Sequence, residues 1–106
     1  MTERLETLLN HIEDSPNDGF LLFAIAKEYE NIGEAEKALE YYEKLRIDDP
    51  KYVGLYYHLA GLYAELDMTE EALAIYEKGI QVAEDLKDLH ALSELKGAKL
   101  NLELEL

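Results

Sequence analysis

A phrase rich in Glu, Lys and Tyr occurs twice in this chain, as ALEYYEKLRIDDP from Ala38 to Pro50 and as ALAIYEKGIQVAED from Ala72 to Asp85. Carboxylates beside amines are side chains that general acid–base catalysis uses. The same residue types also cover exposed helix surfaces, where Glu40 and Lys44 are i, i+4 neighbours in the favourable order. We interpret the phrase as a helix surface, because its Ala and Tyr residues share one helical stripe and its Glu and Lys residues lie outside that stripe.

The other residues that could carry chemistry are scattered. His11, His58 and His90 have no metal-ligand spacing. No serine or threonine lies in a nucleophile motif, and no glycine-rich phosphate loop is present. The chain has no cysteine, which excludes a thiolate metal site and a disulfide framework. We therefore predict a protein that is not an enzyme and has no metal site and no cofactor.

The charge of the chain narrows the classes of partner. Its 106 residues include 24 Asp and Glu against 10 Lys and Arg, a formal net charge of -14. The basic residues form no stripe that could neutralise phosphates, so we expect neither nucleic acid nor an anionic membrane as a partner. An acidic surface keeps a small protein in solution, and it can also steer a basic partner; both interpretations stay open.

The amino-terminal residues argue against an export signal. Glu3, Glu6, Glu13 and Asp14 stand where a signal peptide needs an apolar run, and no apolar stretch is long enough to span a bilayer. Together with the absence of cysteine, these features predict a cytoplasmic protein.

An internal repeat organises the chain. An offset of 34 residues aligns Gly19–Tyr52 with Val53–Leu86, and nine aligned positions are identical. The identities are Leu21/Leu55, Ala26/Ala60, Tyr29/Tyr63, Glu36/Glu70, Ala38/Ala72, Leu39/Leu73, Tyr42/Tyr76, Glu43/Glu77 and Lys44/Lys78. The same offset carries Pro50 back to Pro16, so the first fifteen residues look like the second half of an earlier repeat.

Each repeat has the pattern of two antiparallel helices. In the first repeat we expect helices from Phe20 to about Ile32 and from Ala35 to Ile47, joined by a left-handed residue at Gly33. In the second repeat Asp67 replaces Gly33, and Thr69 is the expected N-cap of the second helix. The expected inward stripes are Leu22, Ile25, Ala26 and Tyr29; Ala38, Tyr42 and Leu45; Tyr56, Leu59, Ala60 and Tyr63; and Ala72, Tyr76 and Gly79.

This pattern resembles the tetratricopeptide repeat (TPR) family. The family signature is met by Leu22-x2-Ile25-Ala26-x2-Tyr29, Ala38-x3-Tyr42 and Pro50, and again by Tyr56-x2-Leu59-Ala60-x2-Tyr63 and Ala72-x3-Tyr76, with Glu84 in place of the second proline. The resemblance implies an all-α protein, a right-handed α-solenoid of antiparallel helix pairs. We expect about six helices: two full repeats with a half-repeat helix on each side.

The resemblance also implies a division of the chain. We predict one domain over residues 1–106, made of an N-terminal half-repeat helix (1–15), a first repeat (19–52), a second repeat (53–85) and a C-terminal capping helix with a tail (86–106).

The C-terminal segment allows more than one interpretation. One long helix could continue from Thr69, but the repeat register favours a break near Asp85 to Asp88, with Asp88 as N-cap and a last helix from about Leu89. We place Leu89, Leu92 and Ser93 on the inward face of that helix. The tail from Leu100 to Leu106 alternates like a strand, yet Leu95, Leu102 and Leu106 share a helical stripe, so we favour a helix that frays into a loose tail.

In the family that this chain resembles, the first helices of successive repeats line a concave groove that holds a peptide or a helix of a partner. The corresponding site residues here are Phe20, Phe23, Lys27, Asn31, Tyr57, Gly61 and Ala64, together with Glu30, Gly54 and Glu65 at less distinctive positions. The inward stripes leave no place for the three aromatic residues Phe20, Phe23 and Tyr57. They either form a contact surface or are buried by the terminal helices.

Some family members hold a terminal carboxylate between Lys, Arg and Asn side chains. Lys27 and Asn31 match one side of such a clamp, but Gly54, Gly61 and Glu65 do not match the other, so we do not predict it. Two functions remain: an interaction module that binds a peptide or helix of a partner protein in the groove, or a homodimeric assembly unit whose groove is the self-association interface.

Overall fold

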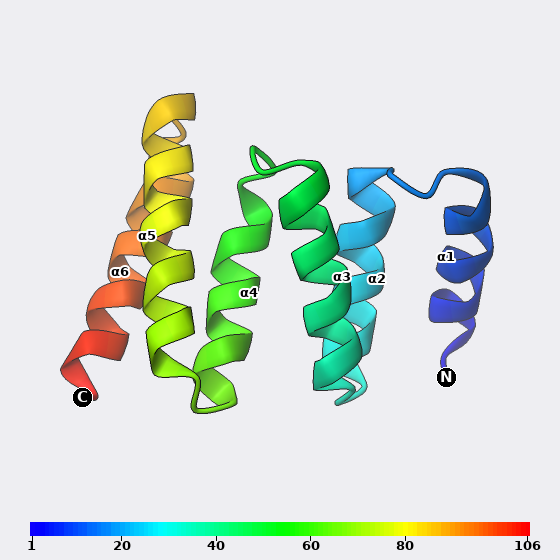
Figure 1. The fold of residues 1–106 in the computed structure, drawn as a ribbon, viewed down its shortest axis with the longest axis horizontal. Coiled ribbons are helices and arrows are strands. Elements are labelled where there is room, and N and C mark those ends of the chain that lie inside the picture. Colours follow the sequence, from blue (N-terminus) through cyan, green and yellow to red (C-terminus); the bar gives the residue numbers. More distant parts are fainter. The chain divides into compact units, whose positions relative to one another are not determined.

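The computed structural model describes residues 1–106 and contains six α-helices and no strand. They are α1 (Glu3–Asp14), α2 (Gly19–Asn31), α3 (Ala35–Asp48), α4 (Gly54–Glu65), α5 (Thr69–Leu86) and α6 (Leu89–Leu104). The chain divides into two compact units, Met1–Tyr52 with α1 to α3 and Val53–Leu106 with α4 to α6. Within each unit, consecutive helices run in opposite directions (Figure 1). The predicted division into repeats and flanking segments stays a prediction.

Three of the four connections inside the units, α2–α3, α4–α5 and α5–α6, are tight turns of one type. Each contains one residue with positive φ: Gly33 (80°), Asp67 (60°) and Lys87 (57°). The amide of the following residue bonds to the carbonyl five residues earlier, from Glu34 to Tyr29, from Met68 to Tyr63 and from Asp88 to Ala83. These bonds satisfy carbonyls that the end of a helix would leave free. The expected left-handed residues Gly33 and Asp67 are confirmed, and so is the break before α6.

Side-chain caps begin three of the helices. Thr2, Asp18 and Asp88 accept hydrogen bonds from backbone amides in the first turns of α1, α2 and α6. The cap at Asp88 was expected, but Thr69 is not a cap. The carbonyl of Met68 already accepts the first bond of α5 from the Ala72 amide, so Thr69 is the first helical residue and its side chain makes no capping bond.

The cores of the two units follow the predicted stripes. In the first unit Leu5, Leu22, Ile25, Ala26, Ala38, Tyr42 and Leu45 are fully buried; in the second unit Leu55, Tyr56, Leu59, Ala60, Ala72 and Ala83 are. Within α2 to α5 one predicted core position differs, because Tyr63 is only half-buried while its neighbour Leu62 is buried.

Helix α6 points a different face inward from the one predicted with Leu89, Leu92 and Ser93. Leu89 is 76% exposed and Ser93 is exposed, whereas Leu95 is buried and its Cδ1 atom lies 3.2 Å from where a Cβ atom on Gly79 would be. Because glycine has no side chain, Leu95 fits against Gly79. This contact determines which face of α6 points inward. The helix continues to Leu104, and the end of the predicted stripe at Leu106 is exposed.

No helix of the structure has both the length and the apolar character that crossing a membrane requires. The cytoplasmic location stays a prediction.

Candidate functional site

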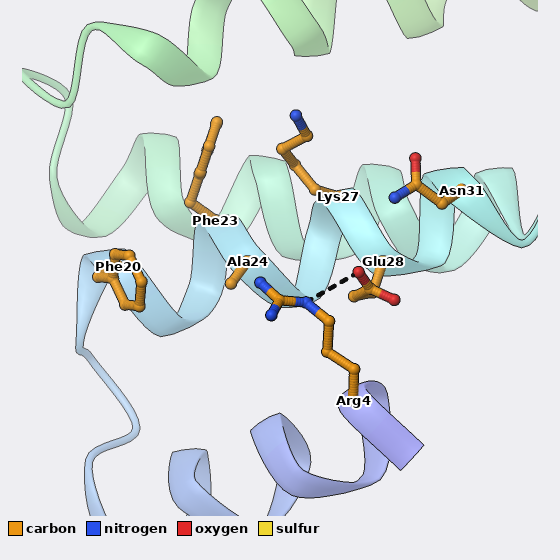
Figure 2. A pocket seen from close by; sticks show the side chains of 7 residues that line it. All are labelled: Arg4, Phe20, Phe23, Ala24, Lys27, Glu28 and Asn31. Atoms are coloured by element: carbon orange, nitrogen blue, oxygen red, sulfur yellow. Dashed lines mark ion pairs between the residues drawn. The ribbon is translucent and has the colours of Figure 1, made fainter. Parts of the chain in front are cut away.

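An open hollow of about 380 Å³ lies on the exposed face of α2 in the first unit. Its lining consists of Arg4, Phe20, Phe23, Ala24, Lys27, Glu28 and Asn31. Figure 2 shows six of these side chains along α2, with Arg4 reaching across from α1. The helical spacing of the α2 residues spreads them over one broad face of the helix, and Phe23, Lys27 and Asn31 form the edge of that face farther from Arg4 (Figure 2). Four of them, Phe20, Phe23, Lys27 and Asn31, are residues that the sequence analysis proposed for a binding surface.

The two phenylalanines of this hollow differ in their surroundings. Phe20 is 66% exposed and stands at one end of the hollow (Figure 2). Phe23 is half-buried, with its ring centroid 5.3 Å from that of Tyr52 and 6.1 Å from that of Tyr42. Phe23 therefore has a packing role that the sequence analysis did not foresee. Phe20 is the freely accessible aromatic side chain of the hollow.

One ion pair crosses from α1 to α2 at the edge of the hollow. The Nε atom of Arg4 lies 3.0 Å from Oε1 of Glu28, and the hydroxyl of Thr2 donates to Oε2 of the same carboxylate at 3.4 Å. Both oxygens of Glu28 are thereby occupied. This contact is not predictable from the sequence, because nothing in the residue pattern relates position 4 to position 28.

Lys27 has no carboxylate within ion-pair distance, and its Nζ atom lies 6.0 Å from the centre of the Phe23 ring. Figure 2 shows Lys27, Phe23 and Asn31 pointing to the side of α2 opposite Arg4. Lys27 is therefore the cation of this face that no carboxylate compensates, whereas Arg4 is paired with Glu28.

Glu30, also assigned to the groove, has a structural contact instead. It accepts a 2.7 Å hydrogen bond from the hydroxyl of Tyr42. Burial and, to a smaller extent, this bond raise the pKa of Tyr42 well above its ordinary value. Tyr42 thus stays a hydrogen-bond donor at neutral pH.

The second unit carries the other predicted site residues. Tyr57 is 44% exposed and lines a shallower hollow of about 280 Å³ between α4 and α6. The α6 residues of that hollow are Ser93, Glu94, Gly97, Ala98 and Asn101. Gly61 and Ala64 are half-buried, and Gly54 and Glu65 are exposed. The terminal helices thus leave both Phe20 and Tyr57 accessible to solvent.

The repeated Glu and Lys residues take part in ion pairs along the helix surfaces. Lys44 pairs with Asp48 at 3.0 Å rather than with Glu40, which lies 3.6 Å from Lys37. Glu43 forms a two-point contact with Arg46, and Glu77 lies 2.6 Å from Lys99. The predicted Glu40–Lys44 pair is wrong, because Asp48 stands one turn beyond Lys44 and competes for it. No group of three or more His, Asp or Glu side chains is arranged to hold a metal ion.

Comparison with known proteins relates the chain to one family. A family model described as tetratricopeptide repeat matches residues 33–95. A tetratricopeptide repeat domain protein from Salinibacter ruber, solved by NMR, is 44% identical, with a TM-score of 0.79 over 83% of this chain and 89% of that protein. No curated protein matches this chain.

More distant structures share the fold. The TPR2B domain of yeast Sti1, solved in a complex with pHsp70, is 14% identical, with a TM-score of 0.89 over 96% of this chain and 82% of that one. A protein from Bordetella parapertussis is 21% identical, with a TM-score of 0.85 over 99% and 91% of the two chains. These similarities confirm the all-α class, six helices packed in adjacent pairs as in tetratricopeptide repeat solenoids.

Proposed function

This chain belongs to the tetratricopeptide repeat family, and we propose that it is an interaction module that binds a peptide or helix of a partner protein on the exposed face of α2. Domains of this family are generally non-catalytic and mediate protein–protein interactions, as in the complex of the Sti1 TPR2B domain with pHsp70.

One observation carries the assignment of the surface. Phe20 is 66% exposed at the end of a hollow that also contains Phe23, Ala24 and Lys27. Exposed aromatic side chains beside a hollow are the usual anchors of protein interfaces. We propose Phe20 as the apolar anchor, Phe23 as its half-buried support, and Lys27 and Asn31 as polar contacts.

Tyr57 in the second unit has the same exposed character and is a second proposed anchor, with Gly61 and Ala64 beside it on α4. Small residues at these two positions leave room for a partner backbone to approach the helix.

A displayed peptide library tests the proposal. Peptides selected against the full chain should lose binding to Phe20→Asp. They should still bind Ile47→Asp, a matched control, because Ile47 is 74% exposed on α3 and lies outside the hollow. Both positions are exposed, so we expect both variants to fold. Selected peptides that bind Phe20→Asp and the parent equally well would refute the assignment of this surface.

Self-association is the second candidate, favoured by the same exposed apolar residues, Phe20 and Tyr57. Light scattering over a dilution series distinguishes the two. A dimer that dissociates in the Phe20→Asp, Tyr57→Asp double variant supports the assembly unit, and a monomer at all concentrations eliminates it.

A further inference from the structure

The charged groups that line the hollow on α2 leave only hydrogen-bond donors unoccupied. Glu28 is the sole carboxylate of the lining, and its two oxygens are taken by Arg4 and Thr2. Arg4 uses its Nε atom for this pair and its side chain is 66% exposed, and the two Nη groups remain as donors for a ligand. Lys27 has no anionic partner. An incoming group would therefore meet the ammonium of Lys27, which has no carboxylate partner, and the remaining donors of an Arg4 guanidinium that is paired with Glu28.

We propose that this hollow recognises an acidic side chain, Asp or Glu, that stands next to a large apolar residue in the partner segment. The proposal rests on the docking surface proposed above and names the chemistry of its occupant. The carboxylate binds the Nη groups of Arg4, Lys27 adds positive charge at the far edge of the same face of α2, and the apolar neighbour packs on Phe20.

The pairing between Arg4 and Glu28 prepares the guanidinium for this role. The bond at Nε, 3.0 Å long, holds the guanidinium in front of α2 beside Ala24 (Figure 2). A side chain already held by one bond loses less conformational entropy when its remaining donors bind a ligand. Arg4 and Ala24, the small residue of the hollow, both belong to its lining.

The net charge of -14 opposes an acidic partner at long range. Salt screens that repulsion beyond about 8 Å at physiological ionic strength, whereas contacts at hydrogen-bond distance are screened much less. Local complementarity at Arg4 and Lys27 therefore decides which residue the hollow accepts, and the long-range field chiefly slows association.

Amide chemical shifts of the full, isotope-labelled chain test the proposal with blocked tetrapeptides, which carry no terminal charges. The probes are acetyl-GFEG-amide and its neutral counterpart acetyl-GFQG-amide. We expect the acidic peptide to shift amides of α2 and of Arg4 and to bind about fivefold more tightly than the neutral one. Equal affinity of the two peptides, or no shift at α2 with either, overturns the proposal.

Variants of the chain locate the effect. Arg4→Gln should abolish the preference for the acidic peptide, and Lys27→Gln should reduce it about twofold. Lys27 makes no ion pair, so its substitution leaves the fold intact even if Arg4→Gln loosens α1. Lys96→Gln, an equal charge change at an exposed position of α6, should leave the preference unchanged. A loss of preference in Lys96→Gln as large as in Arg4→Gln contradicts a local site.

A third peptide, acetyl-GGF with a free terminal carboxylate, separates the two sources of a carboxylate. It should bind more weakly than acetyl-GFEG-amide, and equal or tighter binding overturns the assignment to a side chain. If the docking surface itself is wrong, neither tetrapeptide shifts amides of α2. If both tetrapeptides shift the same α2 amides with one affinity, the surface stands and only its preference for an acid is refuted.

Discussion

The helix pairs α2–α3 and α4–α5 follow one sequence pattern but fill their interiors with different side chains. The repeat offset aligns Leu22 with Tyr56 and Leu45 with Gly79, and all four residues are buried. A Cβ atom on Gly79 would lie 2.5 Å from Cβ of Tyr56. The tyrosine in the second pair thus occupies space that a side chain at position 79 would need. The two pairs therefore fill equivalent positions with different combinations of large and small residues, and Leu95 of α6 also packs at Gly79.

The two pairs also differ in how they use an equivalent tyrosine. Tyr42 donates to Glu30, whereas Tyr76 has Ala64 at the position equivalent to Glu30 and its hydroxyl makes no hydrogen bond to the protein. The polar contact between Tyr42 and Glu30 therefore has no equivalent at Tyr76 and Ala64.

The most disruptive test of this comparison is Gly79→Leu, which places in α5 the residue that α3 has at the equivalent position. We expect a loss of about 3 kcal/mol in the free energy of unfolding, measured by urea denaturation, because the new side chain collides with Tyr56. Adding Tyr56→Leu makes room and should restore part of that loss. Unchanged stability in the single variant would contradict the close contact of α4 and α5.

Ala26→Leu and Ala60→Leu test a position at which the two pairs agree. Both alanines are fully buried, so each substitution should cost roughly 1–3 kcal/mol by overpacking. Ala74→Leu, at an exposed position of α5, is the control and should change the melting temperature little. If only one of the two substitutions lowers the free energy of unfolding, the helices of the other pair are less closely packed.

Tyr42→Phe and Tyr76→Phe compare the equivalent tyrosines directly. Tyr42→Phe should lower the free energy of unfolding by about 1–2 kcal/mol, because the half-buried carboxylate of Glu30 loses its donor. Tyr76→Phe should stay within about 0.5 kcal/mol of the parent. Equal costs in urea denaturation would show that the bond to Glu30 adds no stability.

The last expected effect is absent at neutral pH and is a loss of stability at high pH. Burial, followed by the bond to Glu30, raises the pKa of Tyr42 above its ordinary value of 10.0. Above about pH 10 the unfolded chain releases this proton and the folded chain keeps it, so stability falls by up to about 1.4 kcal/mol per pH unit. The contribution is fully present below pH 10. Urea denaturation at rising pH should show a shallower fall for Tyr42→Phe than for the parent; parallel curves would contradict this.

Local signals in the sequence were reliable where one residue decides the backbone. Gly33 and Asp67 have the left-handed conformation expected of them, and Asp88 caps α6. Lys87, also left-handed, was not foreseen because its side chain gives no such signal. Met68 and Thr69 are both candidates for the N-cap of α5. The geometry of the preceding turn, and not the residue type, makes Met68 the N-cap.

Glu84, in place of the expected proline, has a visible consequence. Helices α3 and α5 start at equivalent residues, yet α3 has 14 residues and α5 has 18. Proline and the residue before it disfavour helix, so α3 ends at Asp48, whereas α5 continues for another turn to Leu86.

Only some residues of the candidate site could be predicted from the sequence. Phe20 and Tyr57 were singled out because the inward stripes had no place for them, and both are exposed. Phe23 was singled out for the same reason, yet it packs on Tyr52, which follows α3 in the chain. Arg4 was missed altogether, because its contact with Glu28 joins two helices whose spacing carries no common pattern.

The sequence by itself determined the helices, most of their ends, the residues that share a face and the repeat family, because periodicity and turn residues act over a few neighbouring positions. Only the tertiary structure decided the inward face of α6, the contact of Gly79 with Tyr56, and the placement of Arg4 and Glu30. These depend on the volume and hydrogen-bonding capacity that one helix leaves to another, which emerge only when the helices pack.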